Sequence, residues 1–309
     1  MDPHASRSPA ASKPEGAPGH VSVLLGEILE FAPPEVRRIL DATVGLGGHG
    51  FALLSAHPNA SLLAFDRDGS ALELASKRLS SFGGRVEFRH GDFRDGLSGI
   101  PPQSLCYAIA DLGVSSLQLD APERGFSFRF DAPLDMRMDP RGGRSASDIL
   151  NTASEKELEH ILTEYGEEPK ARAIVRSIVM ERRTRSTWTT SAFASLVRRD
   201  ARGRPGLDPA TRAFQALRIA TNAELQDLDR GLERLAELLR PGGRLAVIAF
   251  HSLEDRIVKN LFRTLRRSGG FELLTPKPVV PRDREARANP RARSAKLRVI
   301  EKRASVAAS

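Results

Sequence analysis

The stretch Arg38-Ile-Leu-Asp-Ala-Thr-Val-Gly-Leu-Gly-Gly-His-Gly50 decides the fold of this 309-residue chain. A short apolar run ends in an acid, and a cluster of glycines then leads into Phe51-Ala-Leu-Leu-Ser-Ala56, a predicted helix. Gly45, Gly47 and Gly50 satisfy G-x-G-x-x-G, the pattern of dinucleotide-binding turns. A strand that turns through glycine into a helix directs backbone N–H groups and the positive helix end at a ligand.

The next strand-like run, Ser61-Leu-Leu-Ala-Phe65, is closed by Asp66. Asp66 lies 16 residues after Gly50, close to the spacing at which such folds place a carboxylate on the ribose hydroxyls. Taken alone, Asp66 fits a solvated turn equally well. Together with the glycine turn it indicates a ligand that carries an adenosine, and both NAD and S-adenosylmethionine meet that description.

The composition, 40% hydrophobic and 28% charged, is that of a soluble globular protein. The single cysteine, Cys106, excludes an intramolecular disulfide and a cysteine-based zinc cluster, and favours the reducing cytoplasm. No apolar run is long enough to span a membrane. The histidines are scattered without metal-ligand spacing, so no metal site is expected.

Basic residues are concentrated near one end of the chain. Residues 256–303 hold 15 Lys/Arg against 4 Asp/Glu, whereas the formal net charge of the whole chain is +8. Such a concentration favours a polyanionic partner such as nucleic acid over a general surface decoration.

Alternating strand and helix patterns predict an α/β fold with a parallel sheet, interrupted by a run of amphipathic helices. Within the sheet domain we expect a helix over 70–80 capped by Ser70, and a long helix from Thr211 to Leu239 that Pro241-Gly-Gly brings to an end. The expected organisation is a disordered extension (1–19), a discontinuous sheet domain (20–115 and 210–300), an inserted all-helical domain (116–209) and a disordered tail (301–309).

Polar residues follow the predicted strands at their carboxyl ends, where ligands of open α/β sheets bind. They are Asp41 and the glycine turn, Asp66, Asp92 with Phe93, Asp111, and His251 in His-Ser-Leu-Glu-Asp-Arg256. One such ending is ordinary, but a full set predicts a site.

Several long motifs, in this order, resemble the MraW/RsmH family of bacterial 16S ribosomal RNA cytosine-N4 methyltransferases. They are Asp41-Ala-Thr-Val-Gly-Leu-Gly-Gly-His49, Asp111-Leu-Gly-Val-Ser-Ser-Leu-Gln118, Glu123-Arg-Gly-Phe-Ser-Phe128, Pro133-Leu-Asp-Met-Arg-Met-Asp-Pro140, Pro209-Ala-Thr-Arg-Ala-Phe-Gln-Ala-Leu-Arg-Ile219, Phe250-His-Ser-Leu-Glu-Asp-Arg256 and Asn289-Pro-Arg-Ala-Arg-Ser294. The resemblance implies a Rossmann-like methyltransferase sheet that uses S-adenosyl-L-methionine, with 16S rRNA, within the small ribosomal subunit, as partner.

The resemblance also implies roles for individual residues of this chain. Gly47, Gly48 and His49 would contact the methionine and ribose part of the cofactor, Asp66 the ribose hydroxyls, Phe93 the adenine side, and Asp111 and Gln118 the methyl end.

Methyl transfer to an exocyclic amine needs an acceptor for the amine's N–H, because the nitrogen lone pair is delocalised into the ring. Asp111 is the first candidate for that acceptor and for the proton afterwards, although binding the cofactor alone is an equal alternative. His251 is the second candidate, against a structural role. Arg124, Arg129 and Arg137 are candidate RNA contacts, and the basic C-terminal segment would hold phosphates.

Three other functions remain open at this point. They are a nicotinamide dehydrogenase, a non-catalytic RNA-binding ribosome assembly factor, and an amino-methyltransferase that acts on another nucleic acid.

Overall fold

The structure, a computed structural model, describes residues 22–201 and 208–304. The extension predicted at 1–19 lies outside the described residues, as do residues 305–309 of the predicted tail. Residues 301 and 302 of that tail instead belong to a strand that pairs with β5 and β6, which corrects the tail's expected start.

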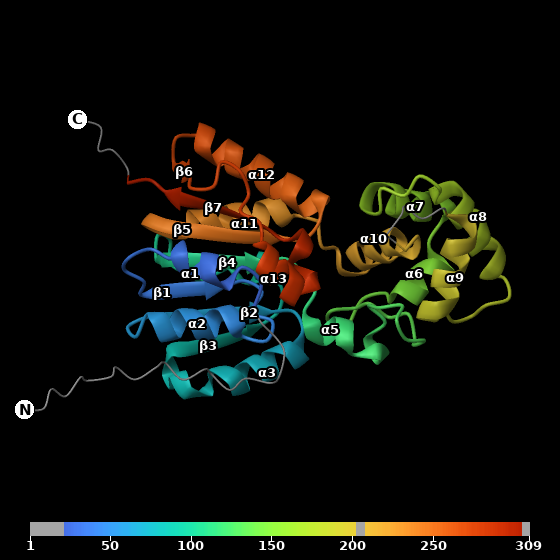
Figure 1. The fold of residues 1–309 in the computed structure, drawn as a ribbon, viewed down its shortest axis with the longest axis horizontal. Coiled ribbons are helices and arrows are strands. Elements are labelled where there is room, and N and C mark those ends of the chain that lie inside the picture. Colours follow the sequence, from blue (N-terminus) through green and yellow to red (C-terminus); the bar gives the residue numbers. More distant parts are fainter. Residues whose placement is uncertain (1–21, 202–207, 305–309) are drawn as a thin grey trace, which may run out of the picture.

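Seven strands form one sheet in the order β3-β2-β1-β4-β5-β7-β6 (Figure 1). They are β1 (Arg38–Asp41), β2 (Ser61–Asp66), β3 (Val86–His90), β4 (Leu105–Asp111), β5 (Leu239–Ala249), β6 (Phe271–Leu273) and β7 (Lys296–Lys302). The first five pair in parallel, whereas β7 is antiparallel to both β5 and β6. The strand order reverses between β1 and β4, so their carboxyl ends flank a switch point at which ligands bind in such sheets.

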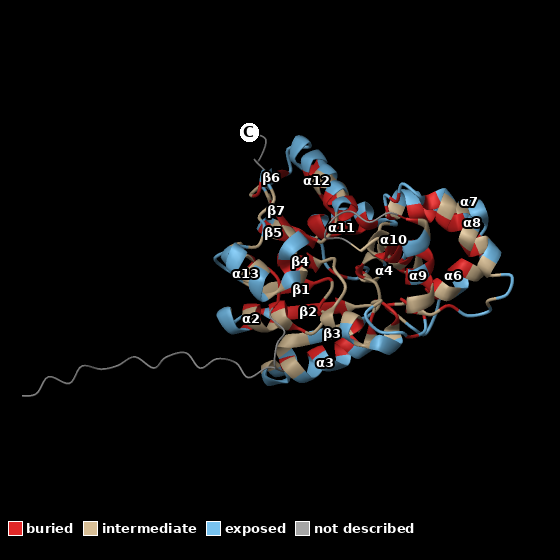
Figure 2. Ribbon diagram, turned by 45° about the vertical axis from the view of Figure 1, so that its right-hand side comes forward, coloured by how far each residue is buried: buried red, intermediate tan, exposed pale blue. Residues whose placement is uncertain are grey.

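Helices cover both faces of the sheet, and the buried strands lie between them (Figure 2). Side chains from α1 (Leu25–Glu30), α2 (Gly48–Ala56) and α3 (Gly69–Leu79) pack on one face. Those of α4 (Phe93–Gly96), α11 (Leu228–Glu237) and α12 (Ser252–Arg267) pack on the other. The remaining short elements near the sheet are η1 (Ser80–Arg85), α13 (Asp283–Ala288) and η4 (Pro290–Ser294).

The helical segment between β4 and β5 has a hydrophobic core of its own. Its elements are α5 (Ser116–Asp120), η2 (Pro122–Arg124), α6 (Ala146–Thr152), α7 (Glu155–His160), η3 (Ile161–Tyr165), α8 (Ala171–Glu181), α9 (Thr190–Asp200) and α10 (Ala210–Asn222). Phe214 and Leu217 of α10 are buried in this core, so the helical packing continues past the boundary expected at 209.

Three local expectations differ from the structure. The helix expected from 211 to 239 is two helices, α10 and α11, because the chain leaves the helical path at Ala223, which has a φ of 47°. Pro241-Gly-Gly lies inside β5, where the pairing with β4 shifts register. Asp68, not Ser70, caps α3, because its carboxylate accepts the backbone N–H of Ser70. Among the described helices, none is long and apolar enough to cross a membrane.

Candidate active site

A pocket lies at the carboxyl edge of the sheet, over the switch point between β1 and β4. The glycine turn and the ends of β2 and β4 line one part of it, and Met138 of the helical segment lines another. Of the site residues predicted from the sequence, the pocket brings together Gly48, His49, Asp66, Phe93, Asp111 and Gln118.

Asp66 ends β2 and is fixed by the glycine turn. Its Oδ2 accepts the N–H of Gly45 at 2.8 Å, and its Oδ1 accepts the N–H of Asp68 at 2.9 Å. Burial raises the pKa of Asp66 to about 6, although both backbone N–H groups act to lower it. Each carboxylate oxygen keeps a free lone pair, so the group is preorganised to accept hydrogen bonds from a diol.

The glycines of the turn have different tasks. A Cβ on Gly48 would lie 2.0 Å from Oγ of Ser22, so only a glycine allows Ser22 to pack this closely in the pocket wall. Gly47 caps α2 with a φ of 76° and faces α3, where a Cβ would lie 3.4 Å from Ala75. Gly50 is already in α2, and a Cβ there would meet Leu62 of β2 at 2.7 Å. Gly47 and Gly50 therefore serve backbone geometry and helix–strand packing.

Phe93 starts α4, is buried and lines the pocket. Asp92 caps the same short helix and is paired with Arg94 at 2.6 Å and Arg67 at 3.1 Å. Although burial acts to raise it, these hydrogen bonds and charges hold the pKa of Asp92 below its usual value. An apolar ring beside a fixed, charged edge is a surface on which a purine can lie.

Two carboxyl groups meet at the switch point, one from β1 and one from β4. Burial raises the pKa of Asp41 to about 7; the Thr43 N–H opposes this, and the charges of Asp111 and Asp66 add to it. Burial likewise raises the pKa of Asp111, and His49 partly offsets that rise. Oδ1 of Asp111 is buried and accepts no hydrogen bond from the described residues. An unsatisfied buried oxygen in a pocket wall indicates a donor on the ligand.

His49 faces Asp111 from the first turn of α2. Its Nε2 lies 2.9 Å from the carbonyl oxygen of Val23, which requires a proton on Nε2. Its other ring nitrogen, Nδ1, lies 3.8 Å from Oδ2 of Asp111.

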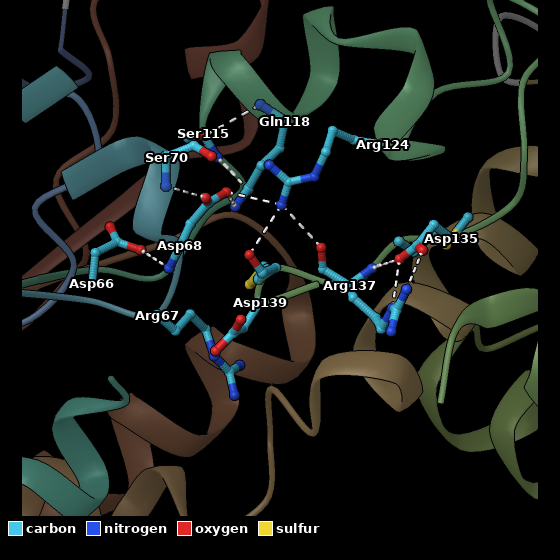
Figure 3. Close-up of polar contacts among 12 residues, drawn as sticks. Asp66, Arg67, Asp68, Ser70, Ser115, Gln118, Arg124, Asp135, Arg137 and Asp139 are labelled. Carbon is cyan, nitrogen blue, oxygen red and sulfur yellow. Dashed lines mark hydrogen bonds and ion pairs between the residues drawn. The ribbon is translucent and has the colours of Figure 1, made fainter. Parts of the chain in front are cut away.

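Gln118 lines the pocket, but both ends of its amide are engaged. Its Oε1 accepts the N–H of Ser115 in a capping box, and its Nε2 donates to Oδ2 of Asp68 at 2.9 Å (Figure 3). Its polar atoms thus connect the segment after β4 to the turn after β2.

His251 lies apart from the predicted set. It caps α12 by accepting the N–H of Glu254, and it is Glu254, not His251, that lines the pocket. Glu224, His251 and Glu254 are close enough to be considered as metal ligands. Both oxygens of Glu224, however, accept hydrogen bonds from Arg218, at 2.8 and 2.9 Å, so this carboxylate is already neutralised.

The three predicted RNA contacts have different surroundings. Arg129 is exposed. Arg137 is held by the carboxylate of Asp135. Arg124 is largely buried and is paired with Asp68 at 2.9 Å, so the expectation that it faces RNA is wrong.

The sequence placed Asp41 at a strand end but gave no sign that it titrates, and it did not reveal Asp68 as a buried anchor. The position of Asp41 carried a usable signal, since it is an acid at the end of an apolar strand. Asp68 carried a weaker one, the Asp66-x-Asp68 spacing, which does not reveal the distant partners of the second acid.

A doubly wound sheet with a glycine turn, a buried carboxylate at the end of β2 and a buried acid at the switch point is the arrangement expected of an S-adenosylmethionine-dependent methyltransferase. The model of the MraW methylase family matches residues 17–303, and the chain belongs to this family. The expected family, fold class and cofactor are thereby confirmed, and the dehydrogenase alternative is rejected.

Curated relatives are similar over nearly their whole length. Ribosomal RNA small subunit methyltransferase H of Citrifermentans bemidjiense is 46% identical over 306 residues, which cover 92% of this chain and 98% of that protein. The protein of the same name from a Cyanothece species is 52% identical over 266 residues, covering 85% and 87%. Among solved structures, an rRNA methylase from Streptococcus thermophilus is 13% identical with a TM-score of 0.41, covering 90% of this chain and 93% of that one.

Proposed function

We propose that this protein methylates the exocyclic N4 amine of a cytidine in 16S ribosomal RNA, within the small subunit and in the cytoplasm. The relatives named for methylation of small-subunit ribosomal RNA support the substrate class. The observation that carries the chemistry is the buried, unpartnered Oδ1 of Asp111 in the pocket wall.

The pocket residues fit the cofactor. S-adenosylmethionine, when bound, supplies a methyl group on a sulfonium that an amine can attack in line. Asp66 would accept hydrogen bonds from the ribose hydroxyls, and Phe93 would lie on the adenine side. Gly48 and His49 would face the methionine and ribose part, with Gly47 holding the turn behind them.

Asp111 would act on the amine. Its Oδ1 would accept one N–H of N4, which turns the nitrogen lone pair out of conjugation and toward the methyl group. The carboxylate would then take the proton that N4 loses as the new N–C bond forms. Gln118 would support this end indirectly, through its hydrogen bonds to Ser115 and Asp68. The target base must leave its stack to reach the pocket, as is usual for enzymes that modify bases.

We place the phosphate contacts on one part of the basic segment, the stretch from α13 to η4. Asn289 and Arg291 of this stretch line the pocket, and Arg284, Arg287 and Arg293 are exposed. The arginines at the C-terminal end of α12 are a different surface. That helix leaves the carboxyl edge at Ser252, and at about 1.5 Å per residue it carries Arg263 and Arg266 about 17 and 21 Å along its axis.

The first experiment uses 30S subunits from a strain that lacks the endogenous activity. The protein is incubated with them and with labelled S-adenosylmethionine, and the modified nucleoside is identified by mass spectrometry. N4-methylcytidine is expected from the wild type and from the matched control Asp229→Asn, an exposed acid on α11, but not from Asp111→Asn. If the protein binds the cofactor but places no label in RNA, the proposal is contradicted and a non-catalytic role in ribosome assembly is favoured. If label appears only in another nucleic acid, the protein is an amino-methyltransferase for that nucleic acid.

The phosphate surface has its own test. The double variant Arg284→Gln/Arg287→Gln should weaken binding to 30S subunits and reduce the slope of log affinity against log salt by about 0.7 to 0.9 for each arginine–phosphate interaction that is removed. The matched double variant Arg263→Gln/Arg266→Gln should bind like the wild type. Equal losses of affinity in both pairs would contradict the assignment of phosphate binding to α13 and η4.

A further inference from the structure

Asp68 is a fully buried carboxylate that joins three segments of the chain (Figure 3). Its Oδ1 accepts the N–H of Ser70 at the start of α3. Its Oδ2 accepts Nε2 of Gln118 and is paired with Nη2 of Arg124, each at 2.9 Å. Asp68 follows Asp66 by two residues, and its own N–H holds the Asp66 carboxylate. Asp68 is therefore a buried negative charge next to the proposed cofactor contact Asp66, and Arg124 is the cation that neutralises it.

Arg124 links Asp68 to the loop that leads into the helical segment. The same Nη2 donates to the carbonyl oxygens of Arg137 and Met138, each at 3.0 Å, and the carbonyl oxygen of Arg124 accepts the N–H of Met136. The backbones also meet closely beside it, because a Cβ on Gly125 would lie 2.4 Å from the Pro133 carbonyl oxygen.

The loop held in this way is part of the pocket. Met138 lines the pocket, and its N–H donates to Oδ1 of Asn222 in α10. Nδ2 of Asn222 donates in turn to the carbonyl oxygen of Met136. The short segment 136–138 is thus clamped between Arg124 on one side and α10 on the other.

We propose that Arg124 is a positioning residue for methyl transfer: it fixes the Met138 wall of the pocket relative to Asp66 and Asp68, so that the acceptor amine is held in line with the methyl group. The predicted loss of rate rests on the proposed function, methyl transfer to a cytidine amine. An in-line displacement is sensitive to alignment, and a misplacement of about 1 Å costs on the order of 100-fold in rate. Arg124 contacts neither reactant in this assignment, so its loss should lower the rate and leave both affinities nearly intact.

The test compares three variants. Arg124→Met removes all three donations. Arg124→Lys keeps a positive charge near Asp68, but its side chain is one atom shorter and its ammonium lacks the planar fork of arginine. Arg144→Met is the matched control: Arg144 follows the same loop, is exposed, and pairs with Glu157 inside the helical segment. All assays are run below the unfolding temperature of the least stable variant.

With 30S subunits as substrate, Arg124→Met should lower kcat by about 10- to 100-fold while the Kd for S-adenosylhomocysteine and for the subunit change by no more than about threefold. Arg124→Lys should recover part of kcat, because it keeps the charge opposite Asp68 without the fixed geometry, and Arg144→Met should equal the wild type. An unchanged kcat in Arg124→Met would overturn the proposal, as would a loss carried wholly by the affinity for RNA.

Hydrogen exchange provides a readout that does not depend on the substrate. The amides of Met136 and Met138 should exchange faster in Arg124→Met than in the wild type, but not in Arg144→Met. If the wild type methylates no RNA, the proposed function fails on its own, and the exchange result still decides the positioning role: unchanged protection at both amides overturns it.

Discussion

Oδ2 of Asp111 and Nδ1 of His49 lie 3.8 Å apart at the point where the strand order of the sheet reverses. His49 is held from behind by the Val23 carbonyl oxygen, and Asp111 is held through its own N–H, which donates to Oγ1 of Thr43. The His49 ring cannot turn away without breaking its buried contact with Val23, and the backbone that carries Asp111 is fixed by Thr43. At this distance His49 acts to lower the pKa of Asp111, against the larger effect of burial, which raises it.

This pair predicts the acid limb of the pH–rate profile. Asp111 must be ionised to accept the amine N–H, and burial raises its pKa, so kcat should fall as the pH drops through that raised value. His49→Gln keeps a donor for the Val23 carbonyl but removes the positive charge that lowers the pKa of Asp111. The acid limb should then move to higher pH, as measured by kcat from about pH 5 to 9. A limb that stays in place, or moves to lower pH, contradicts this role for Asp111.

Asp66 should control cofactor affinity in a pH-dependent way. Its pKa is raised to about 6, so the carboxylate that accepts from the ribose hydroxyls becomes protonated below that pH. The Kd for S-adenosylhomocysteine should therefore increase as the pH falls from 7 to 5, by calorimetric titration. Asp66→Asn should weaken binding by about 10- to 100-fold at pH 7 and remove the pH dependence. A wild-type Kd that is flat across this range would show that Asp66 does not hold the diol.

The strand ends were predictable because each strand is a local apolar run, and the ends of parallel strands meet at one edge. That argument alone brings Asp66, Asp111 and the glycine turn together. The pairing of Asp68 with Arg124 was not predictable, since it joins segments far apart in the chain and depends on how the loop before α6 folds back. The same limit applies to α10: its amphipathic pattern predicts a helix but does not reveal which of two cores receives its apolar face. Asp68 and Ser70 are both good caps, so sequence could not choose between them.

Asp41 should make stability depend on pH. Its pKa is about 7 in the folded protein and near 3.8 when the group is solvated, so the folded state favours the protonated form. This contribution is fully present below about pH 4 and is lost as the pH rises through about 7. Asp41→Asn keeps the acceptor for the Thr43 N–H without the charge. The Tm of this variant should exceed that of the wild type by more at pH 8 than at pH 5. The corresponding change in its free energy of unfolding relative to the wild type, between the two pH values, is on the order of 2 to 4 kcal/mol. Equal gains at both pH values would mean that Asp41 is not protonated in the folded protein.

The two adjacent glycines of the turn should separate stability from binding. Gly47→Ala places a side chain at a φ of 76° and against Ala75, so it should lower the Tm, at a cost of about 1 to 2 kcal/mol. Gly48→Ala forces the Ser22 hydroxyl, 2.0 Å from the added Cβ, to move within the pocket wall. It should raise the Kd for S-adenosylhomocysteine by about 3- to 10-fold. Ser22→Ala removes that hydroxyl, so the double variant should regain affinity; a double variant as weak as Gly48→Ala would contradict this cause.

His251 should affect the stability of α12 and not the chemistry. Its Nδ1 accepts the N–H of Glu254, so the ring is engaged at the start of the helix, whereas its buried Nε2 lies 3.1 Å from Oε1 of the same residue without a hydrogen bond. Asparagine is among the best N-cap residues and keeps an acceptor, whereas alanine removes it at a cost of about 1 kcal/mol. His251→Asn should therefore have a kcat close to the wild type, and His251→Ala should have a lower Tm with kcat preserved at temperatures where it is folded. If His251 removed the proton from N4, both variants would lose kcat together, and no choice of helix cap would restore it.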